Sequence, residues 1–134
     1  MLPKIIKLPV NKHSSGNLIS LSSLNEIPFT IERFYTIYLT NSNEPRGFHA
    51  HKNLKQAIFC INGSVDIYLD DGFTKSTITL DDPTKCLLIE KPIWREMLNF
   101  TENCILNVLC DQPYNSNDYI RNYDNFLKLI KNEK

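Results

Sequence analysis

Short apolar segments with partial period-two alternation dominate the chain. Successive side chains of a strand point to opposite faces, so this alternation predicts strands with one buried face. The same segments are rich in β-branched and aromatic residues, which favour pleated structure. The expected strands fall within residues 4–10, 29–39, 56–72, 73–80, 86–92, 95–101 and 104–111, and a turn in 14–21 leads into a further strand.

Glycine-containing dipeptides separate several of these segments. Asn62-Gly63 and Asp71-Gly72 can supply the positive φ angles of tight hairpin turns. They predict two hairpins in succession over residues 61–80. No linker or low-complexity tract interrupts the chain, so we expect a single domain over residues 1–134.

The C-terminal tail is the one segment with helical spacing. Ser116 or Asn117 can cap a helix there. Its apolar positions share one face, namely Ile120, Tyr123, Phe126 or Leu127, and Ile130. Many short strands followed by one helix predict an all-β barrel with the helix packed on its outside, because closure removes exposed strand edges.

The balance of positive and negative residues excludes partners that bind a protein through its net charge. The chain has 15 Lys and Arg against 15 Asp and Glu, so we expect neither nucleic acid nor a membrane as a partner. Residues 1–16 contain Pro3 and only short apolar runs, which are typical neither of a signal peptide nor of a membrane span. We therefore expect a cytoplasmic protein.

The four cysteines show no metal-site spacing. Cys60, Cys86, Cys104 and Cys110 lie in or beside apolar runs and form no CxxC motif. Buried free thiols are therefore expected rather than disulfides or zinc ligands.

Two histidines stand one residue apart in the segment EPRGFHAHKNLKQ. His49 and His51 project from the same face if residues 46–51 form a strand. Three interpretations are open for such a pair: exposed histidines at a strand edge, a metal site, or acid-base catalysis.

The surrounding residues resemble the metal-site pattern of the cupin family in outline. Gly47, His49 and His51 match its first part, but Gln56 stands where a glutamate is expected and Arg95 where a third histidine is expected. A guanidinium stays protonated and repels a divalent cation. We therefore expect no metal at this site. The same cation suits an anionic intermediate such as an enediolate.

Five linked motifs make the resemblance narrower. The segments IPFTIERFYTIY, EPRGFHAHKNLKQ, INGSVDIYLDDG, PIWREMLNF and NDYIRNYDNF occur in order over residues 27–126. They resemble the sugar 3,4-ketoisomerases, small jelly-roll cupins with a C-terminal helix that act on dTDP-4-keto-6-deoxyglucose. The resemblance implies a cofactor-free transfer of the carbonyl from C4 to C3.

The resemblance also implies roles for three residues. His49 is expected to be the catalytic base, and His51 its partner in proton transfer or orientation. Tyr35 is expected to donate a hydrogen bond or relay a proton, although strand tyrosines are also common core residues.

Four further residues are expected to bind the substrate. Arg46 and Arg33 are interpreted as diphosphate contacts, with a solvated arginine as the alternative in each case. A β-bulge near Gly47 would turn Arg46 toward the interior. Trp94 is expected to stack on the thymine or the sugar, unless it is a core residue, and Arg95 lies beside it.

The resemblance finally implies a product and a partner. The Trp94-Arg95 pair resembles the pair found in those family members that make the gluco-configured 3-keto sugar. That sugar is the precursor of a 3-amino-3,6-dideoxyhexose for surface polysaccharide, such as the O-antigen of lipopolysaccharide. A homodimer with exchanged N-terminal strands is expected. The alternatives are a dTDP-deoxysugar epimerase and a non-catalytic cupin that binds a nucleotide sugar.

Overall fold

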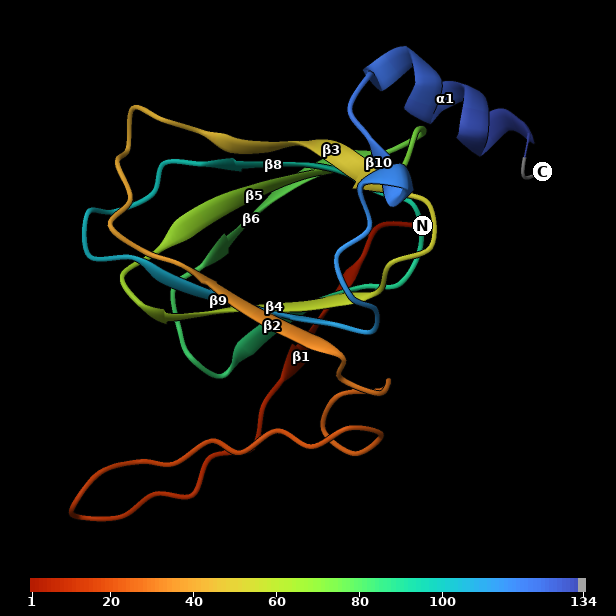
Figure 1. The fold of residues 1–134 in the computed structure, drawn as a ribbon. Helices are drawn as coiled ribbons and strands as arrows, with labels where there is room; N and C mark the ends of the chain where they lie inside the picture. Colours follow the sequence, from red (N-terminus) through yellow and green to blue (C-terminus); the bar gives the residue numbers. More distant parts are fainter. Residues whose placement is uncertain (133–134) are drawn as a thin grey trace.

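Two five-stranded antiparallel sheets face each other in the computed structural model, which describes residues 1–132 (Figure 1). The strand order is β1-β7-β4-β9-β2 in the first sheet and β10-β3-β8-β5-β6 in the second. The elements are β1 (Lys4–Lys7), β2 (Arg33–Ile37), β3 (Arg46–His51), β4 (Gln56–Asn62), β5 (Val65–Asp70), β6 (Lys75–Leu80), β7 (Lys85–Ile89), β8 (Trp94–Leu98), β9 (Ile105–Cys110), a 3-10 turn η1 (Ser116–Asp118), β10 (Tyr119–Ile120) and α1 (Tyr123–Asn132). The expected all-β class with a C-terminal helix is confirmed.

The main core lies between the two sheets and follows from the alternation in the strands. In β5, Val65, Ile67 and Leu69 are buried while Asp66 and Tyr68 between them are partly exposed. They pack against apolar residues of both sheets, among them Ile58, Leu87, Met97, Leu106 and Val108. Burial of these side chains, at about 25 cal/mol per Å² of apolar surface, supplies the main driving force for the fold.

The link between β4 and β5 crosses from one sheet to the other, so the first of the two predicted hairpins is wrong. The second, between β5 and β6, is confirmed. The backbone of Ser64 exchanges hydrogen bonds with Thr101 instead of with β4, through its N–H to Oγ1 and its carbonyl to the Thr101 N–H, both 3.0 Å. Gly63 permits this crossing, because it has a φ of +69° and a Cβ there would lie 2.9 Å from Cα of Cys104.

The segment between β1 and β2 forms an extended arm rather than the expected further strand. Figure 1 shows it running away from the two sheets before it returns to β2. Its two halves meet in an isolated bridge between Asn11 and Leu18, and His13 and Gly16 close the turn at its tip. Such a short pairing leaves Leu18 and Leu24 exposed.

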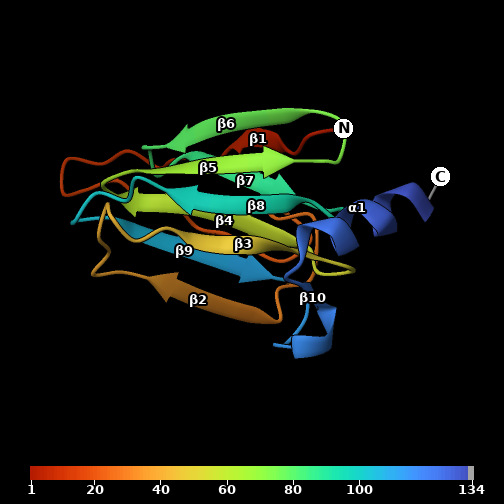
Figure 2. The ribbon, with the colours of Figure 1, turned by 90° about the horizontal axis from the view of Figure 1, so that it is seen from above.

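The α-helix of the C-terminal tail begins only at Tyr123, so the cap predicted at Ser116 or Asn117 is wrong, and residues 116–118 form the 3-10 turn η1 instead. Ile120 belongs to β10, which pairs with β3. Asn122 caps α1 by accepting a hydrogen bond from the N–H of Asn125 at 3.0 Å. Phe126 packs the helix against the outside of the second sheet, as expected, in a cluster with Ala50, Trp94 and Ile120 (Figure 2). Residues 133 and 134 of the predicted helix lie outside the described residues.

Candidate active site

The strand register brings polar side chains of both sheets to one level of the interior. Directly opposite residues of antiparallel strands share a face. In the first sheet Arg33 and Gln56 each lie opposite Cys110. In the second sheet His49 lies opposite Arg95. A row of polar groups therefore faces a second row across the sandwich.

A bulge in β3 sets the direction of its side chains. The register shifts between Gly47 and His49, so Arg46 lies opposite Met97 while His49 lies opposite Arg95. Arg46 and His49 therefore share the inner face despite their odd spacing. Arg46 itself is exposed and lies at the opposite end of β3 from His51. A role for it in diphosphate binding stays a prediction.

His49 and His51 meet edge to face inside the barrel. Their ring centroids are 4.8 Å apart with an interplanar angle of 82°. The ring of Tyr119 lies against both, with centroids 5.0 Å from His49 and 4.4 Å from His51. His51 is only 2 % exposed. The interpretation of two surface histidines at a strand edge is therefore wrong.

A buried carboxylate contacts His51 of this pair. Nδ1 of His51 lies 3.1 Å from Oδ2 of Asp118. Asp118 reaches this position because β10 pairs with the end of β3, with Tyr119 opposite His51. Neither Asp118 nor Tyr119 follows from the sequence pattern, because the apolar spacing around them imitates a helix.

Arg95 links the histidines to the opposite sheet. Its side chain is 1 % exposed, and its Nε donates to the carbonyl of Ile93 at 3.1 Å. One terminal nitrogen donates to Oε1 of Gln56, and Nε2 of Gln56 donates to the hydroxyl of Tyr35 at 3.3 Å. A hydrogen-bonded chain thus runs from Arg95 through Gln56 to Tyr35.

Burial and the arginines keep the imidazoles neutral near pH 7. Burial, with Arg95 adding to it, lowers the pKa of His49 to about 4. The same two causes lower the pKa of His51. Burial also lowers the pKa of Arg95, to about 10, which still leaves it charged, and raises the pKa of Tyr35. The site therefore combines two neutral acceptors, a neutral phenol and one fixed cation.

Three buried nitrogens of this site have no hydrogen-bond partner within residues 1–132. They are Nδ1 of His49, Nε2 of His51 and one terminal nitrogen of Arg95. Buried polar groups in native proteins are nearly always paired, so three such atoms in adjacent residues indicate a binding site for a polar ligand. Two acceptors beside a cationic donor suit proton transfer to and from an oxygen-rich anion rather than a divalent metal.

Two more arginines lie around the mouth of the site, each over an aromatic ring. The guanidinium carbon of Arg33 lies 4.7 Å from the ring centroid of Tyr35 and 5.3 Å from that of Tyr114. The guanidinium carbon of Arg121 lies 4.4 Å from the ring centroid of Tyr119. A small cavity of about 10 Å³ lies here, bounded by Arg33, His51, Tyr114 and Tyr119 among others.

Trp94 does not reach the site. It precedes Arg95 in β8, so the two side chains point to opposite faces of the sheet. Trp94 packs against α1, with ring centroids 5.4 Å from Tyr123 and 6.2 Å from Phe126, and is 6 % exposed. The expected stacking of Trp94 on the substrate is therefore wrong within this chain, and the core alternative describes its position.

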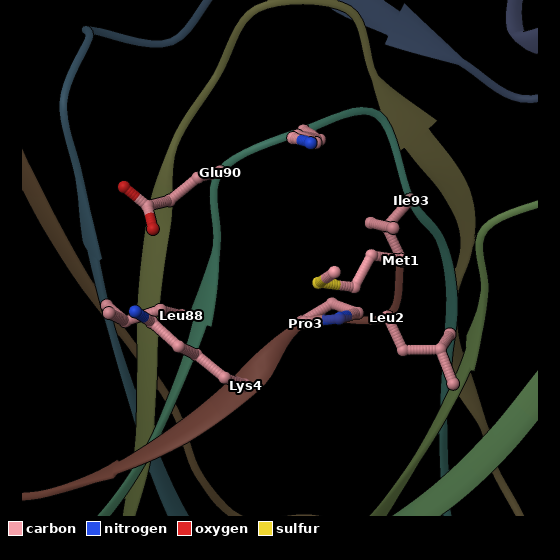
Figure 3. Close-up of a pocket in the computed structure, with 8 residues that line it drawn as sticks. Met1, Leu2, Pro3, Lys4, Leu88, Glu90 and Ile93 are labelled. Atoms are coloured by element: carbon pink, nitrogen blue, oxygen red, sulfur yellow. The ribbon is translucent and has the colours of Figure 1, made fainter.

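A larger pocket of about 200 Å³ lies elsewhere and has a different character (Figure 3). Figure 3 shows its lining, in which apolar side chains stand beside the charged Lys4 and Glu90. The lining residues are Met1, Leu2, Pro3, Lys4, Leu88, Glu90, Lys91 and Ile93. None of the residues expected to act on a substrate lines it.

Comparison with known proteins assigns the family. The family model described as FdtA, WxcM-like, C-terminal, matches residues 1–131. The chain belongs to this family. The resemblance to sugar 3,4-ketoisomerases drawn from the sequence is confirmed by relatives and solved structures that carry this activity in their names, and the cupin-like jelly roll by the shared fold of those structures.

Two relatives named as 3,4-oxoisomerase or 3,4-ketoisomerase match nearly the whole chain. A TDP-4-oxo-6-deoxy-α-D-glucose 3,4-oxoisomerase of Aneurinibacillus thermoaerophilus is 44% identical over 127 residues, or 95% of this chain and 91% of the relative. The sugar 3,4-ketoisomerase QdtA of Thermoanaerobacterium thermosaccharolyticum, in complex with TDP, is 39% identical with a TM-score of 0.95 over 98% of this chain and 96% of that chain.

A further ketoisomerase structure and a more distant epimerase structure are also similar to this chain. The TDP-quinovose 3,4-ketoisomerase WlaRB of Campylobacter jejuni is 45% identical with a TM-score of 0.92 over 94% of this chain and 97% of that chain. A dTDP-4-dehydrorhamnose 3,5-epimerase of Bacillus anthracis is 16% identical with a TM-score of 0.73 over 87% of this chain and 76% of that chain, which shows a shared fold alone.

No helix within residues 1–132 is long and apolar enough to span a membrane.

Proposed function

We propose that this protein is a TDP-sugar 3,4-ketoisomerase that converts TDP-4-keto-6-deoxyglucose into the 3-keto sugar. The observation that carries the proposal is the meeting of two neutral imidazoles and a buried guanidinium, each with one nitrogen that has no hydrogen-bond partner among the described residues. The activity of the relatives in the same family supports it.

The reaction needs one proton taken from carbon and one returned. The C4 ketone acidifies the proton at C3, and His49 removes it as a neutral base. The electrons of the broken C–H bond form a C3–C4 enediolate whose negative oxygen lies beside Arg95. Transfer of the O3 proton to O4, followed by protonation at C4, leaves a ketone at C3 and a hydroxyl at C4. No electron leaves the sugar, so the residues of the site suffice.

Incubation with TDP-4-keto-6-deoxyglucose in deuterium oxide tests this function. NMR of the product should show the carbonyl at C3 and deuterium at C4, also with a chelator present. His49→Asn should lower the rate by at least 100-fold, because the base is removed. His13→Asn is the matched control, since His13 lies in the exposed turn of the arm. A carbonyl that stays at C4 would indicate an epimerase, and binding without turnover would indicate a non-catalytic cupin.

The proposed product is TDP-3-keto-6-deoxyglucose with the gluco configuration at C4. The Trp94-Arg95 pair supports it through the sequence resemblance, and so does the likeness to a TDP-quinovose 3,4-ketoisomerase. Such a 3-keto sugar is a substrate for amino transfer to a 3-amino-3,6-dideoxyhexose of surface polysaccharide. The proton coupling constants at C4 in the NMR spectrum of the product distinguish gluco from galacto.

The proposed assembly is a homodimer that exchanges its N-terminal strands. The arm with its exposed Leu18 and Leu24 supports this, because a second subunit would cover these side chains. Ile6 of β1 lies opposite Cys86 of β7. In an Ile6→Cys variant treated with a thiol oxidant, exchanged strands give a covalent dimer on a non-reducing gel, whereas unexchanged strands give a cross-linked monomer.

A cytoplasmic location is part of the proposal and is supported by four free, buried cysteines.

A further inference from the structure

Asp118 has all the contacts of a fixed ionised carboxylate. Its Oδ1 accepts the backbone N–H of Asn53 at 2.8 Å, and its Oδ2 accepts that of Leu54 at 3.3 Å. The side chain of His51 adds a third contact, at 3.1 Å to Oδ2. Asp118 is 7 % exposed, so these contacts replace the water that an ionised carboxylate otherwise binds.

The backbone around Asp118 is as firmly held as its side chain. The N–H of Lys52 donates to the Asp118 carbonyl at 3.0 Å, and the Asp118 N–H donates to the carbonyl of Asn115 at 3.1 Å. The next residue, Tyr119, pairs with His51 in the sheet. The carboxylate therefore has one position relative to the imidazole.

An acceptor with no proton decides the tautomer of its partner. An ionised carboxylate only accepts hydrogen bonds, so Nδ1 of a neutral His51 must carry the proton between them. Nε2 of the same ring then holds a lone pair. This is the buried nitrogen of His51 that has no partner within residues 1–132.

We propose that Asp118 is a positioning residue that holds His51 in its Nδ1–H tautomer, with the Nε2 lone pair free for proton exchange beside His49. The proposal rests on the proposed isomerase function for its kinetic consequence. The assignment of the tautomer does not depend on any substrate. His51 thereby serves as a second acceptor of fixed orientation, rather than as a passive neighbour of the base.

The tautomer can be measured in the full-length, ligand-free protein by nitrogen-15 NMR of the imidazoles near neutral pH. We expect a protonated Nδ1 and an unprotonated Nε2 on His51, with the signals assigned through a His51→Gln variant. A proton on Nε2, or a doubly protonated ring, would overturn the proposal. This measurement stands even if variants of Asp118 fail to fold.

The variant Asp118→Asn tests the consequence, because an amide nitrogen facing Nδ1 favours the opposite tautomer. We expect kcat to fall by at least about 100-fold with KM changed less than threefold, as when the orienting carboxylate of a catalytic histidine is lost. The His51 proton should move to Nε2 in the same variant. Full activity, or lost activity with an unchanged tautomer in a folded variant, would contradict the proposal.

Asp111→Asn is the matched control. Its carboxylate also accepts a backbone N–H, that of Lys55 at 2.8 Å, yet no hydrogen bond joins it to a histidine of the described chain. We expect kcat within twofold of wild type and an unchanged His51 spectrum. A wild-type protein with Nδ1–H on His51 but no isomerase activity would contradict the proposed function and leave the tautomer assignment supported.

Discussion

Arg95 and Gln56 form a hydrogen bond across the interior that joins the inner faces of the two sheets. In the second sheet Arg95 lies opposite His49, and in the first sheet Gln56 lies opposite Cys110. Two positions where the cupin pattern has metal ligands thus hold a donor-acceptor pair. The second terminal nitrogen of Arg95 has no partner in the described part of the chain, and we expect it to face a substrate.

Arg95→Lys should lower kcat by about 10²-fold to 10³-fold, because a lysine cannot keep the bond to Gln56 and also present a second planar donor to the enediolate. Steady-state kinetics with TDP-4-keto-6-deoxyglucose measure the effect. Circular dichroism shows whether the variant is folded. Wild-type kcat in a folded Arg95→Lys protein would remove Arg95 from stabilisation of the intermediate.

The double variant Gln56→Glu with Arg95→His should bind a divalent metal at least tenfold more tightly than wild type. It places a carboxylate and a third imidazole beside His49 and His51, which is a donor set that zinc and similar ions prefer. Isothermal titration calorimetry with zinc compares the two proteins. Equal affinity in both would show that the cation of Arg95 does not govern metal binding.

The buried histidines should make the protein sensitive to mild acid. The pKa of His49 is lowered from 6.5 to about 4 in the folded state, so between these values the unfolded chain binds the proton more readily. Stability therefore falls as pH falls through this range. His49 alone should reduce the free energy of unfolding by about 2 kcal/mol from pH 7 to pH 5.

Urea unfolding of wild type and His49→Gln at both pH values isolates this contribution, because every other titrating group is shared. The variant should lose about 2 kcal/mol less than wild type on acidification. Parallel losses in the two proteins would mean that His49 has an ordinary pKa in the folded state.

Trp94→Phe should weaken the fold without weakening substrate binding. Trp94 packs on the outer face of β8, where its Nε1 donates to Glu96 at 2.9 Å. Loss of this bond and of ring volume should cost about 1 to 3 kcal/mol in the free energy of unfolding, while KM stays within twofold. A tenfold rise in KM with unchanged stability would restore the stacking role expected from the sequence.

Gly63→Ala should destabilise the protein by about 3 kcal/mol, since the new Cβ combines positive φ with overpacking. It would approach backbone at Cys104 and side-chain oxygens of Thr101 and Asn103. Gly16→Ala is the control, because Gly16 also has positive φ but a Cβ there would have no neighbouring atom of residues 1–132 within 4 Å. Thermal unfolding should show a clearly larger loss for Gly63→Ala than for Gly16→Ala.

The strands and the polar interior follow from local pattern to a large extent. Alternation in β5 and the spacing of His49 and His51 each decide which face a side chain takes, and both interpretations agree with the structure. The same rule places Trp94 and Arg95 on opposite faces of β8, so alternation alone predicts that Trp94 points away from the site. The resemblance of the whole motif led to the opposite expectation.

Other features depend on contacts that local pattern does not contain. Asn62-Gly63 signals a turn, but whether the next strand stays in the same sheet is decided by Thr101, which lies far along the chain. Asp118 meets His51 across a separation of 67 residues. The three-residue spacing of Ile120 and Tyr123 matches a helix when it is read from the sequence alone. Ile120 forms a strand instead because the edge of β3 offers it a pairing partner.

The pairing of β10 with β3 places a constraint on the order of folding. Residues 119 and 120 join a strand that ends at His51, so the carboxylate beside that histidine arrives only when the chain has grown 67 residues beyond it. Pairings of such long range are formed late and slowly, because the entropy of closing the loop must be overcome first. A nascent chain can thus gather much of its apolar core while its proton-transfer machinery is still incomplete.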